Sequence, residues 1–135
     1  MISVGSVLII DDDSATLELA QEILRNAGYA TATASNAFHG LRLVREVKPS
    51  VVVCDMVMPN MAGADLFRTI AADPGTSRTG RVMMSGQAGA DRSCAHVFLA
   101  KPFAAKDLLE AVQKVTSRAT QSTSLPENTE PRWRG

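Results

Sequence analysis

Short apolar runs rich in β-branched residues alternate along the chain with segments in which apolar residues recur every three or four positions. Five runs have the length and composition of β-strands: residues 7–10, 29–34, 51–54, 81–84 and 97–100. Helical spacing follows the first, second, third and fifth runs. This alternation favours βαβ units, in which parallel strands are covered by helices on both faces. We therefore predict a doubly wound α/β domain of (βα)5 type.

Glycine and proline mark where the predicted helices end. The first helix ends at Gly28, a residue suited to a C-terminal cap, and the second spans about residues 37–47 because Pro49 cannot continue it. The third ends near Asp73. The last helix is marked by apolar residues at helical spacing: Ala105, Leu108, Leu109, Val112 and Val115.

The segment before the fifth run does not support a full helix. Residues 87–95 contain Gly89 and no apolar stripe, and the segment is shorter than a typical connection with its own helix, since helices average about 11 to 12 residues. We predict a shortened or missing fourth helix.

The length of 135 residues fits one domain. We expect that domain to cover residues 1–117. Residues 118–135 are rich in Ser, Thr, Pro and Glu without periodicity, so we expect an irregular, disordered tail. Trp133 in this tail could anchor a partner, but a solvated chain end is the simpler interpretation.

Composition excludes several classes of protein. Fourteen basic and fourteen acidic residues give a net charge of zero, which removes the electrostatic drive for nonspecific nucleic-acid binding. The apolar runs fall far short of the roughly 18 residues of a membrane span, and no charged segment precedes an apolar one at the start. Cys54 and Cys94 lack the spacing of a zinc site. We expect a cytoplasmic protein in a reducing compartment, bound to neither membrane nor nucleic acid.

Polar residues follow the predicted strands where a parallel sheet binds its ligands. Asp11 and Asp12 follow the first run, Asp55 the third, Ser85 the fourth and Lys101 the fifth. Two carboxylates about 4 Å apart repel by on the order of 4 kcal/mol at an effective dielectric constant near 20, so a cation is needed between them. Hard oxygen donors favour Mg²⁺. A carboxylate beside a cation, an ammonium and a hydroxyl is suited to phosphoryl transfer, with the carboxylate as nucleophile.

These motifs, in this order, resemble the receiver domain of two-component response regulators over about residues 4–117. The resemblance rests on four segments: VLIIDD at residues 7–12, VVCD at 52–55 with MP at 58–59 and Gly63, SG at 85–86, and LAKPF at 99–103. It implies a flavodoxin-like fold with strand order 2-1-3-4-5. It also implies a phosphoacceptor rather than an enzyme.

The resemblance assigns roles to individual residues. Asp55 would accept a phosphoryl group from a histidine kinase or a histidine phosphotransfer protein. Mg²⁺ would be bound by Asp12, Asp55 and the backbone carbonyl of Val57, with Asp11 reaching it through water.

Three further expectations follow from the same family. Ser85 and Lys101 would contact the phosphoryl oxygens, and a cis peptide bond would precede Pro102. Phe98 falls on the switch aromatic, although an aromatic residue in a short strand is equally well explained as core. Apart from the resemblance, we expect a monomer or a weak dimer.

Simpler explanations account for some neighbouring residues. Asp13 and Ser14 stand where a helix begins, so helix capping explains them without a metal. Cys54 alternates away from Asp55 along its strand and is interpreted as core.

Two other functions compete with the main hypothesis. The more serious is a receiver-like interaction module that works without phosphorylation. The other is a phosphatase of the haloacid-dehalogenase type, because Asp11, Asp13, Ser85 and Lys101 follow that family's order. That family also needs an acidic pair after the lysine, and this sequence lacks one.

Two absences shape the expected mode of signalling. Without an output domain, we expect a stand-alone regulator. Receivers commonly dock partners on the face built by the fourth helix, the fifth strand and the fifth helix, so a shortened fourth helix suggests another surface, with the first or last helix as candidates.

Overall fold

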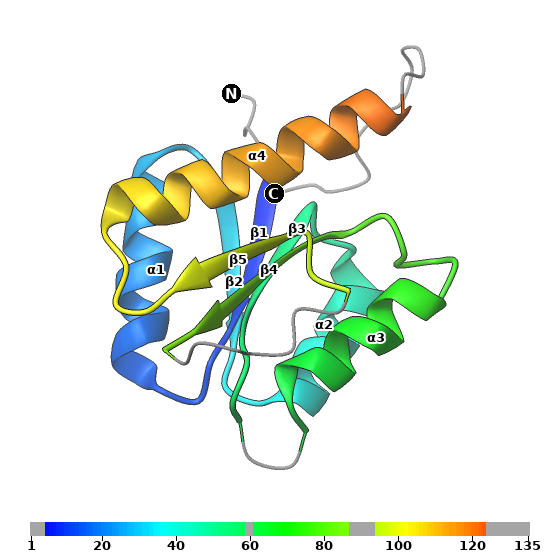
Figure 1. Cartoon of the computed structure of the whole chain (residues 1–135), viewed down its shortest axis with the longest axis horizontal. Coiled ribbons are helices and arrows are strands. Elements are labelled where there is room, and N and C mark those ends of the chain that lie inside the picture. Colours follow the sequence, from blue (N-terminus) through cyan, green and yellow to red (C-terminus); the bar gives the residue numbers. More distant parts are fainter. Residues whose placement is uncertain (1–4, 59–60, 87–93, 124–135) are drawn as a thin grey trace.

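A computed structural model describes residues 5–58, 61–86 and 94–123 of the chain. Its five strands form one parallel sheet in the order β2-β1-β3-β4-β5 (Figure 1). The strands are β1 Ser6–Ile10, β2 Ala30–Ala34, β3 Val51–Asp55, β4 Gly80–Ser85 and β5 Val97–Ala100. The helices are α1 Ser14–Asn26, α2 Ala37–Val47, α3 Gly63–Ala72 and α4 Ala105–Thr123. The predicted doubly wound, flavodoxin-like architecture is confirmed.

Side chains alternate between two cores on opposite faces of the sheet. Val7 and Ile9 of β1 belong to the core that also contains the buried apolar residues of α1 and α4. Leu8 and Ile10 belong to the core beneath α2 and α3. Because the central strands are buried on both faces, they are apolar throughout, and this is why their runs were recognisable in the sequence.

Strand register brings the polar strand ends together. Ile10 pairs with Cys54, so the residues that follow them, Asp11 and Asp55, leave neighbouring strands at the same level. On the other side of β3, Ser85 pairs with Ala100, which places Lys101 directly after it. Four residues that are distant in sequence thus reach the same edge of the sheet: Asp11, Asp55, Ser85 and Lys101.

Local capping agrees with the sequence in most places. Gly28 has φ +99°, and its N–H bonds the carbonyl of Arg25 while the N–H of Tyr29 bonds that of Leu24, so α1 ends in a Schellman motif. The amide of His39 donates to the side chain of Asn36, which caps α2. Asn36 was not identified from the sequence.

The last helix, α4, extends past the expected domain boundary. The helix continues to Thr123, six residues beyond the boundary expected at residue 117. Arg118, Ala119 and Gln121 favour helix, so the last helix continues after its apolar stripe ends. The expected disorder of the remaining residues, 124–135, falls outside the described part of the chain.

No helix separates β4 and β5 among the residues that the structure describes. Residues 87–93, on which the expected shortened or missing fourth helix falls, lie outside the described part of the chain. The described residues form four helices, α1 to α4, where a full (βα)5 repeat would have five. Among the described helices, none is both long enough and apolar enough to span a bilayer.

Candidate functional site

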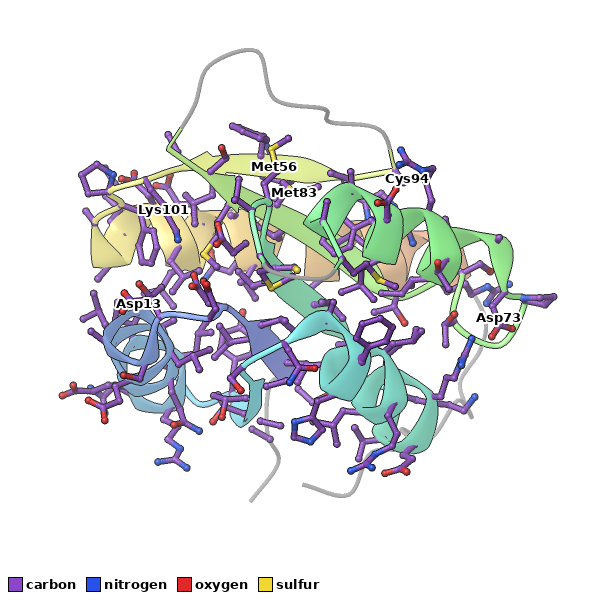
Figure 2. The ribbon with its side chains drawn as sticks, turned by 90° about the horizontal axis from the view of Figure 1, so that it is seen from below. Asp13, Met56, Asp73, Met83, Cys94 and Lys101 are labelled. Atoms are coloured by element: carbon purple, nitrogen blue, oxygen red, sulfur yellow. The ribbon has the colours of Figure 1, made fainter. Side chains whose placement is uncertain are left out.

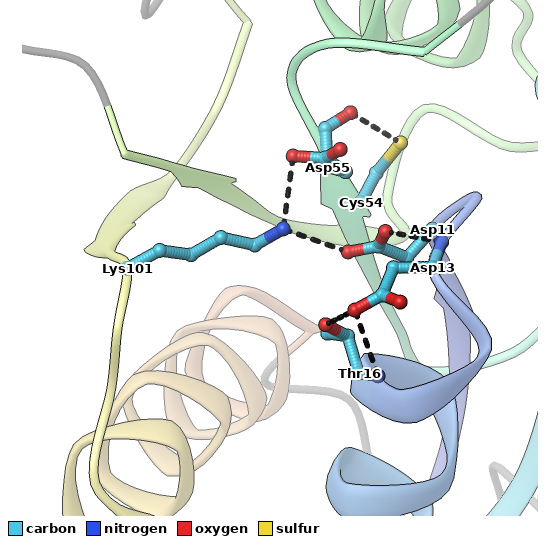
Figure 3. Close-up of polar contacts among 6 residues, drawn as sticks. All are labelled: Asp11, Asp13, Thr16, Cys54, Asp55 and Lys101. Carbon is cyan, nitrogen blue, oxygen red and sulfur yellow. Dashed lines mark hydrogen bonds and ion pairs between the residues drawn. The ribbon is translucent and has the colours of Figure 1, made fainter.

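Three acidic side chains meet at the carboxyl ends of β1 and β3. Asp11, Asp12 and Asp55 each place a carboxylate oxygen within 4.8 Å of the others. The Lys101 ammonium extends from the segment after β5 and lies between two of them (Figure 3). Its Nζ is 2.9 Å from Oδ2 of Asp11 and 3.3 Å from Oδ1 of Asp55. The residues predicted from the strand ends are therefore neighbours in space.

Asp11 is the most deeply held of the three carboxylates. Its side chain is only 1% exposed, and its Oδ1 accepts a hydrogen bond from the backbone N–H of Asp13 at 2.9 Å. Lys101 occupies its other oxygen. With both oxygens engaged by donors, Asp11 is fixed in orientation, whereas Asp12 is exposed and open to a ligand.

The charges around Asp55 do not balance. Burial raises the pKa of Asp55, and the neighbouring Asp11 carboxylate raises it further, against the opposing effect of Lys101. For Lys101, burial favours the neutral amine, but the hydrogen bond and charge of Asp11, followed by Asp55, raise its pKa. Lys101 is thus held as a cation, and its single positive charge lies beside three carboxylates, those of Asp11, Asp12 and Asp55.

This imbalance fits a divalent cation. Three carboxylates around one ammonium leave net negative charge in a pocket where oxygen is the donor type, and Mg²⁺ prefers two or three such ligands completed by water. Asp12 and Asp55 would hold the ion, and Asp11 lies close enough to act through water. Burial and then the Asp11 carboxylate raise the pKa of Asp55, so a bound cation would favour its ionised form.

A glycine allows α3 to approach the loop after Asp55. A Cβ atom on Gly63 would lie 2.4 Å from the carbonyl oxygen of Asp55 and 3.0 Å from Cα of Met56. The N–H of Gly63 donates instead to the Met56 carbonyl at 2.9 Å. Val57, whose carbonyl is the expected metal ligand, belongs to this loop and is exposed. Pro59 of the quoted motif lies outside the described residues.

Ser85 and Phe98 occupy β4 and β5 beside the acidic cluster. Ser85 is buried at the end of β4, and its carbonyl accepts from the Lys101 N–H at 2.9 Å. Phe98 is half-buried and packs against the core beneath α2 and α3. The peptide bond between Lys101 and Pro102 is cis, as the resemblance implied.

Asp13 caps α1, as the simpler explanation predicted. Its Oδ2 accepts from the backbone N–H and the hydroxyl of Thr16, at 3.3 and 2.7 Å. The hydrogen bond from the Thr16 hydroxyl is the main reason that the pKa of Asp13 is lowered. Cys54 is fully buried, which confirms it as core, and its thiol donates to the Asp55 carbonyl.

A buried arginine was missed in the sequence. The Arg81 guanidinium, in β4, donates to the carbonyls of Cys94, Ser77 and Thr79 at 2.5, 3.0 and 3.1 Å. It also contacts the Nε2 atom of His96 at 3.3 Å, while the Arg81 backbone N–H donates to Nδ1 of the same ring. Figure 2 shows Cys94 on the opposite side of the molecule from Asp13 and Lys101. Arg81 thus anchors the segment that leads into β5. The one signal in the sequence was a charged residue at the start of a predicted strand.

Known proteins are similar in sequence to most of this chain. A family model described as the response regulator receiver domain matches residues 7–113. The chemotaxis protein CheY of Thermotoga maritima is 33% identical over 115 residues, which cover 82% of this chain and 96% of CheY. The DNA-binding response regulator MtrA of Mycolicibacterium paratuberculosis is 32% identical over 115 residues, covering 79% of this chain. The matched region covers 49% of MtrA, so the chain spans about half the length of that relative.

Solved structures show the same likeness. A response regulator receiver domain protein from Clostridium thermocellum superimposes with a TM-score of 0.81 at 29% identity, covering 88% of this chain and 99% of the other. A CheY-like receiver domain protein from Methanospirillum hungatei gives a TM-score of 0.82 at 25% identity, covering 89% and 99%. The sequence motifs, the strand order and these matches agree, and the chain belongs to the response regulator receiver domain family.

Proposed function

We propose that residues 1–117 of this chain form a receiver that accepts a phosphoryl group on Asp55 from a histidine kinase or a histidine phosphotransfer protein. The observation that supports it most is the contact of one lysine with two buried acids, Asp11 and Asp55, beside the exposed Asp12. Phosphoryl transfer depends on positioning and charge neutralisation, and this cluster supplies both.

Each residue has a defined part in the transfer. An oxygen of the Asp55 carboxylate bonds to phosphorus while the bond from phosphorus to the donor imidazole nitrogen breaks, and the imidazole leaves with the electron pair. Lys101 stabilises the negative charge on the transferred group, and the Ser85 hydroxyl donates to another of its oxygens. Bound Mg²⁺, held by Asp12, Asp55 and the Val57 carbonyl, would neutralise charge on the phosphoryl oxygens and lower the repulsion between the acids.

The output proposed here is contact with another protein in the cytoplasm. Ser85 moving toward the phosphoryl group would leave room for Phe98 to turn inward, which changes the surface at β5. We propose a monomer or weak dimer without a membrane partner. We also propose no nucleic-acid partner, because a net charge of zero gives no general attraction to phosphates. MtrA bears the name of a DNA-binding regulator, and that property is not transferred to this chain.

The geometry disfavours the phosphatase alternative. A nucleophilic Asp11 would need a free oxygen, but both of its oxygens accept hydrogen bonds and the side chain is only 1% exposed. Asp13, the second acid of that motif, caps α1 instead. The interaction module without phosphorylation is the remaining rival.

Incubation with a small phosphodonor such as acetyl phosphate distinguishes the phosphoacceptor from the interaction module that works without phosphorylation. With Mg²⁺ we expect a mass gain of about 80 Da, one phosphoryl group, which is lost with EDTA and in Asp55→Asn. Asp65→Asn, an exposed aspartate on α3, is the matched control and should be labelled like the wild type. Absence of any mass gain in the wild type would support the interaction module.

A further inference from the structure

A groove runs between β5 and α4 on the side of the sheet where no further strand pairs. β5 bonds only to β4 within the described sheet, so its other edge faces outward. The groove has a volume of about 540 Å³. Its apolar lining includes Val97, Leu99, Pro102 and Ala111. An exposed strand edge beside an apolar hollow is a surface that proteins usually cover.

Three charged side chains line the same groove in a fixed order. Asp107, Glu110 and Lys114 are exposed and stand three and four residues apart, so they share one face of α4. At 1.5 Å per residue, Glu110 lies about 6 Å and Asp107 about 10 Å from Lys114 along the helix axis. Among the described residues, Glu110 and Lys114 form no ion pair. The groove therefore offers one positive charge followed by two negative charges.

The chain after α4 carries the complementary order. Glu130, Arg132 and Arg134 alternate with Pro131 and Trp133. In an extended strand, alternate side chains point the same way, and at about 3.3 Å per residue the two arginines lie about 7 and 13 Å from Glu130. When the segment runs antiparallel to the helix, the first spacing agrees with that of Glu110 and Lys114 to about 1 Å. The second exceeds that of Asp107 and Lys114 by about 3 Å, a difference that the long arginine side chain can span. Trp133 then points to the opposite side, toward the apolar lining.

The chain is long enough to make this contact within one molecule. Lys114 lies nine residues before Thr123, about 14 Å back along the helix. The seven residues 124–130 span at most roughly 23 Å when extended, which leaves length for a turn.

We propose that residues 130–134 of this chain occupy the groove between β5 and α4. Glu130 pairs with Lys114, Arg132 with Glu110 and Arg134 with Asp107, while Trp133 packs against Val97 and Leu99. The segment covers the free edge of β5 from within the same chain. This contact is independent of phosphorylation and would stand if Asp55 were never modified.

Trp133 is the single tryptophan of the chain and reports directly on the contact. Fluorescence of the full chain is compared with a synthetic peptide of residues 124–135, at low salt. We expect a blue-shifted emission and roughly half the acrylamide quenching of the peptide or less, with the difference shrinking in high salt because the ion pairs are exposed. Emission and quenching equal to those of the peptide would overturn the proposal.

Charge exchange tests the pairing itself. Glu110→Lys should abolish the blue shift, and combining it with Arg132→Glu should restore it. Glu22→Lys, an exposed acid on α1, is the matched control and should leave Trp133 unchanged. If Glu110→Lys behaves like Glu22→Lys, the groove is not the site. Protection of Trp133 from acrylamide that grows as the protein concentration rises from about 1 to 100 μM would also contradict the proposal. It would show that the segment docks between separate copies of the chain. Far-UV circular dichroism confirms that each variant is folded.

Discussion

The acidic cluster and the β5 edge belong to one sheet but are held differently. At the cluster, Asp11 is 1% exposed and bonded through both oxygens, and Gly63 lies directly against the Asp55 carbonyl. At the edge, β5 has four residues and one neighbouring strand, and Val97 and Phe98 are half-buried. Tight packing surrounds the proposed chemistry, whereas the β5 edge, the proposed docking site of residues 130–134, is more open.

This difference follows from what each region must do. A site for phosphoryl transfer needs charges fixed within a fraction of an ångström, which requires packed supporting residues. A strand that responds to the site needs a lower local stability, because elements that move are drawn from the less stable parts of a fold. The Arg81 network is the main internal anchor described for β5.

The largest expected effect comes from removing the central cation. Lys101→Met leaves Asp11 and Asp55 without their common ammonium and takes away its stabilisation of the transferred group. We expect the rate of phosphorylation by a small donor to fall roughly 100-fold or more, the usual effect of losing one such donor. Lys106→Met, exposed on α4, is the control. A fall of less than about threefold would contradict the assigned role.

The next largest effect tests the anchor of β5. Arg81→Met leaves the carbonyls of Cys94, Ser77 and Thr79 without their shared donor. We expect the free energy of unfolding in urea to fall by about 2 to 4 kcal/mol. Amide exchange in β5 should accelerate more than in β1. Arg42→Met, an exposed residue on α2, should change stability by less than about 1 kcal/mol. Equal effects of the two substitutions would argue against the anchor.

The close approach of α3 gives a smaller effect. Gly63→Ala would force a backbone shift beside Asp55, so we expect a loss of about 1 to 3 kcal/mol in unfolding free energy and weaker Mg²⁺ binding. Gly75→Ala is the control, because a Cβ there meets no atom closer than 3.5 Å. Unchanged Mg²⁺ affinity in Gly63→Ala would show that the loop tolerates the shift.

The smallest effect concerns the charge of Asp55. Because its pKa is raised in the fold, ionisation of Asp55 opposes folding at neutral pH, and stability is lost as pH rises through the folded pKa. In EDTA at pH 7, Asp55→Asn should therefore raise Tm by roughly 3 to 6 °C, the shift for about 1 kcal/mol in a domain of this size. The gain should vanish below the unfolded pKa of 3.8. If Asp55→Asn has a lower Tm than the wild type at pH 7, the attraction between Lys101 and Asp55 outweighs the repulsion between Asp55 and Asp11.

Much of the fold was predictable because the central strands are buried on both faces. Residues 51–53, all valine, could be little else than a parallel strand, and the rule that ligands bind at carboxyl ends then selected Asp11, Asp55 and Lys101. Helix ends marked by Gly28 and Pro49 were also visible.

The parts that were missed depend on contacts between distant residues. Arg81 stands at the start of the run 81–84, and its partners Cys94 and His96 become neighbours only when β5 pairs with β4. The requirement for glycine at position 63 arises from the approach of α3 to Asp55, which no local pattern encodes. The extension of α4 to Thr123 lacked an apolar stripe and so escaped a search for periodicity.

Mapping the modified residue tests the central claim most directly. The chain is phosphorylated with a small donor and Mg²⁺, the acyl phosphate is reduced with borohydride, and the altered residue is located by peptide sequencing in a mass spectrometer. We predict reduction of Asp55 alone, dependent on Mg²⁺. Modification at Asp11, Asp12 or any other residue, or no modification in the presence of Mg²⁺, would contradict the account.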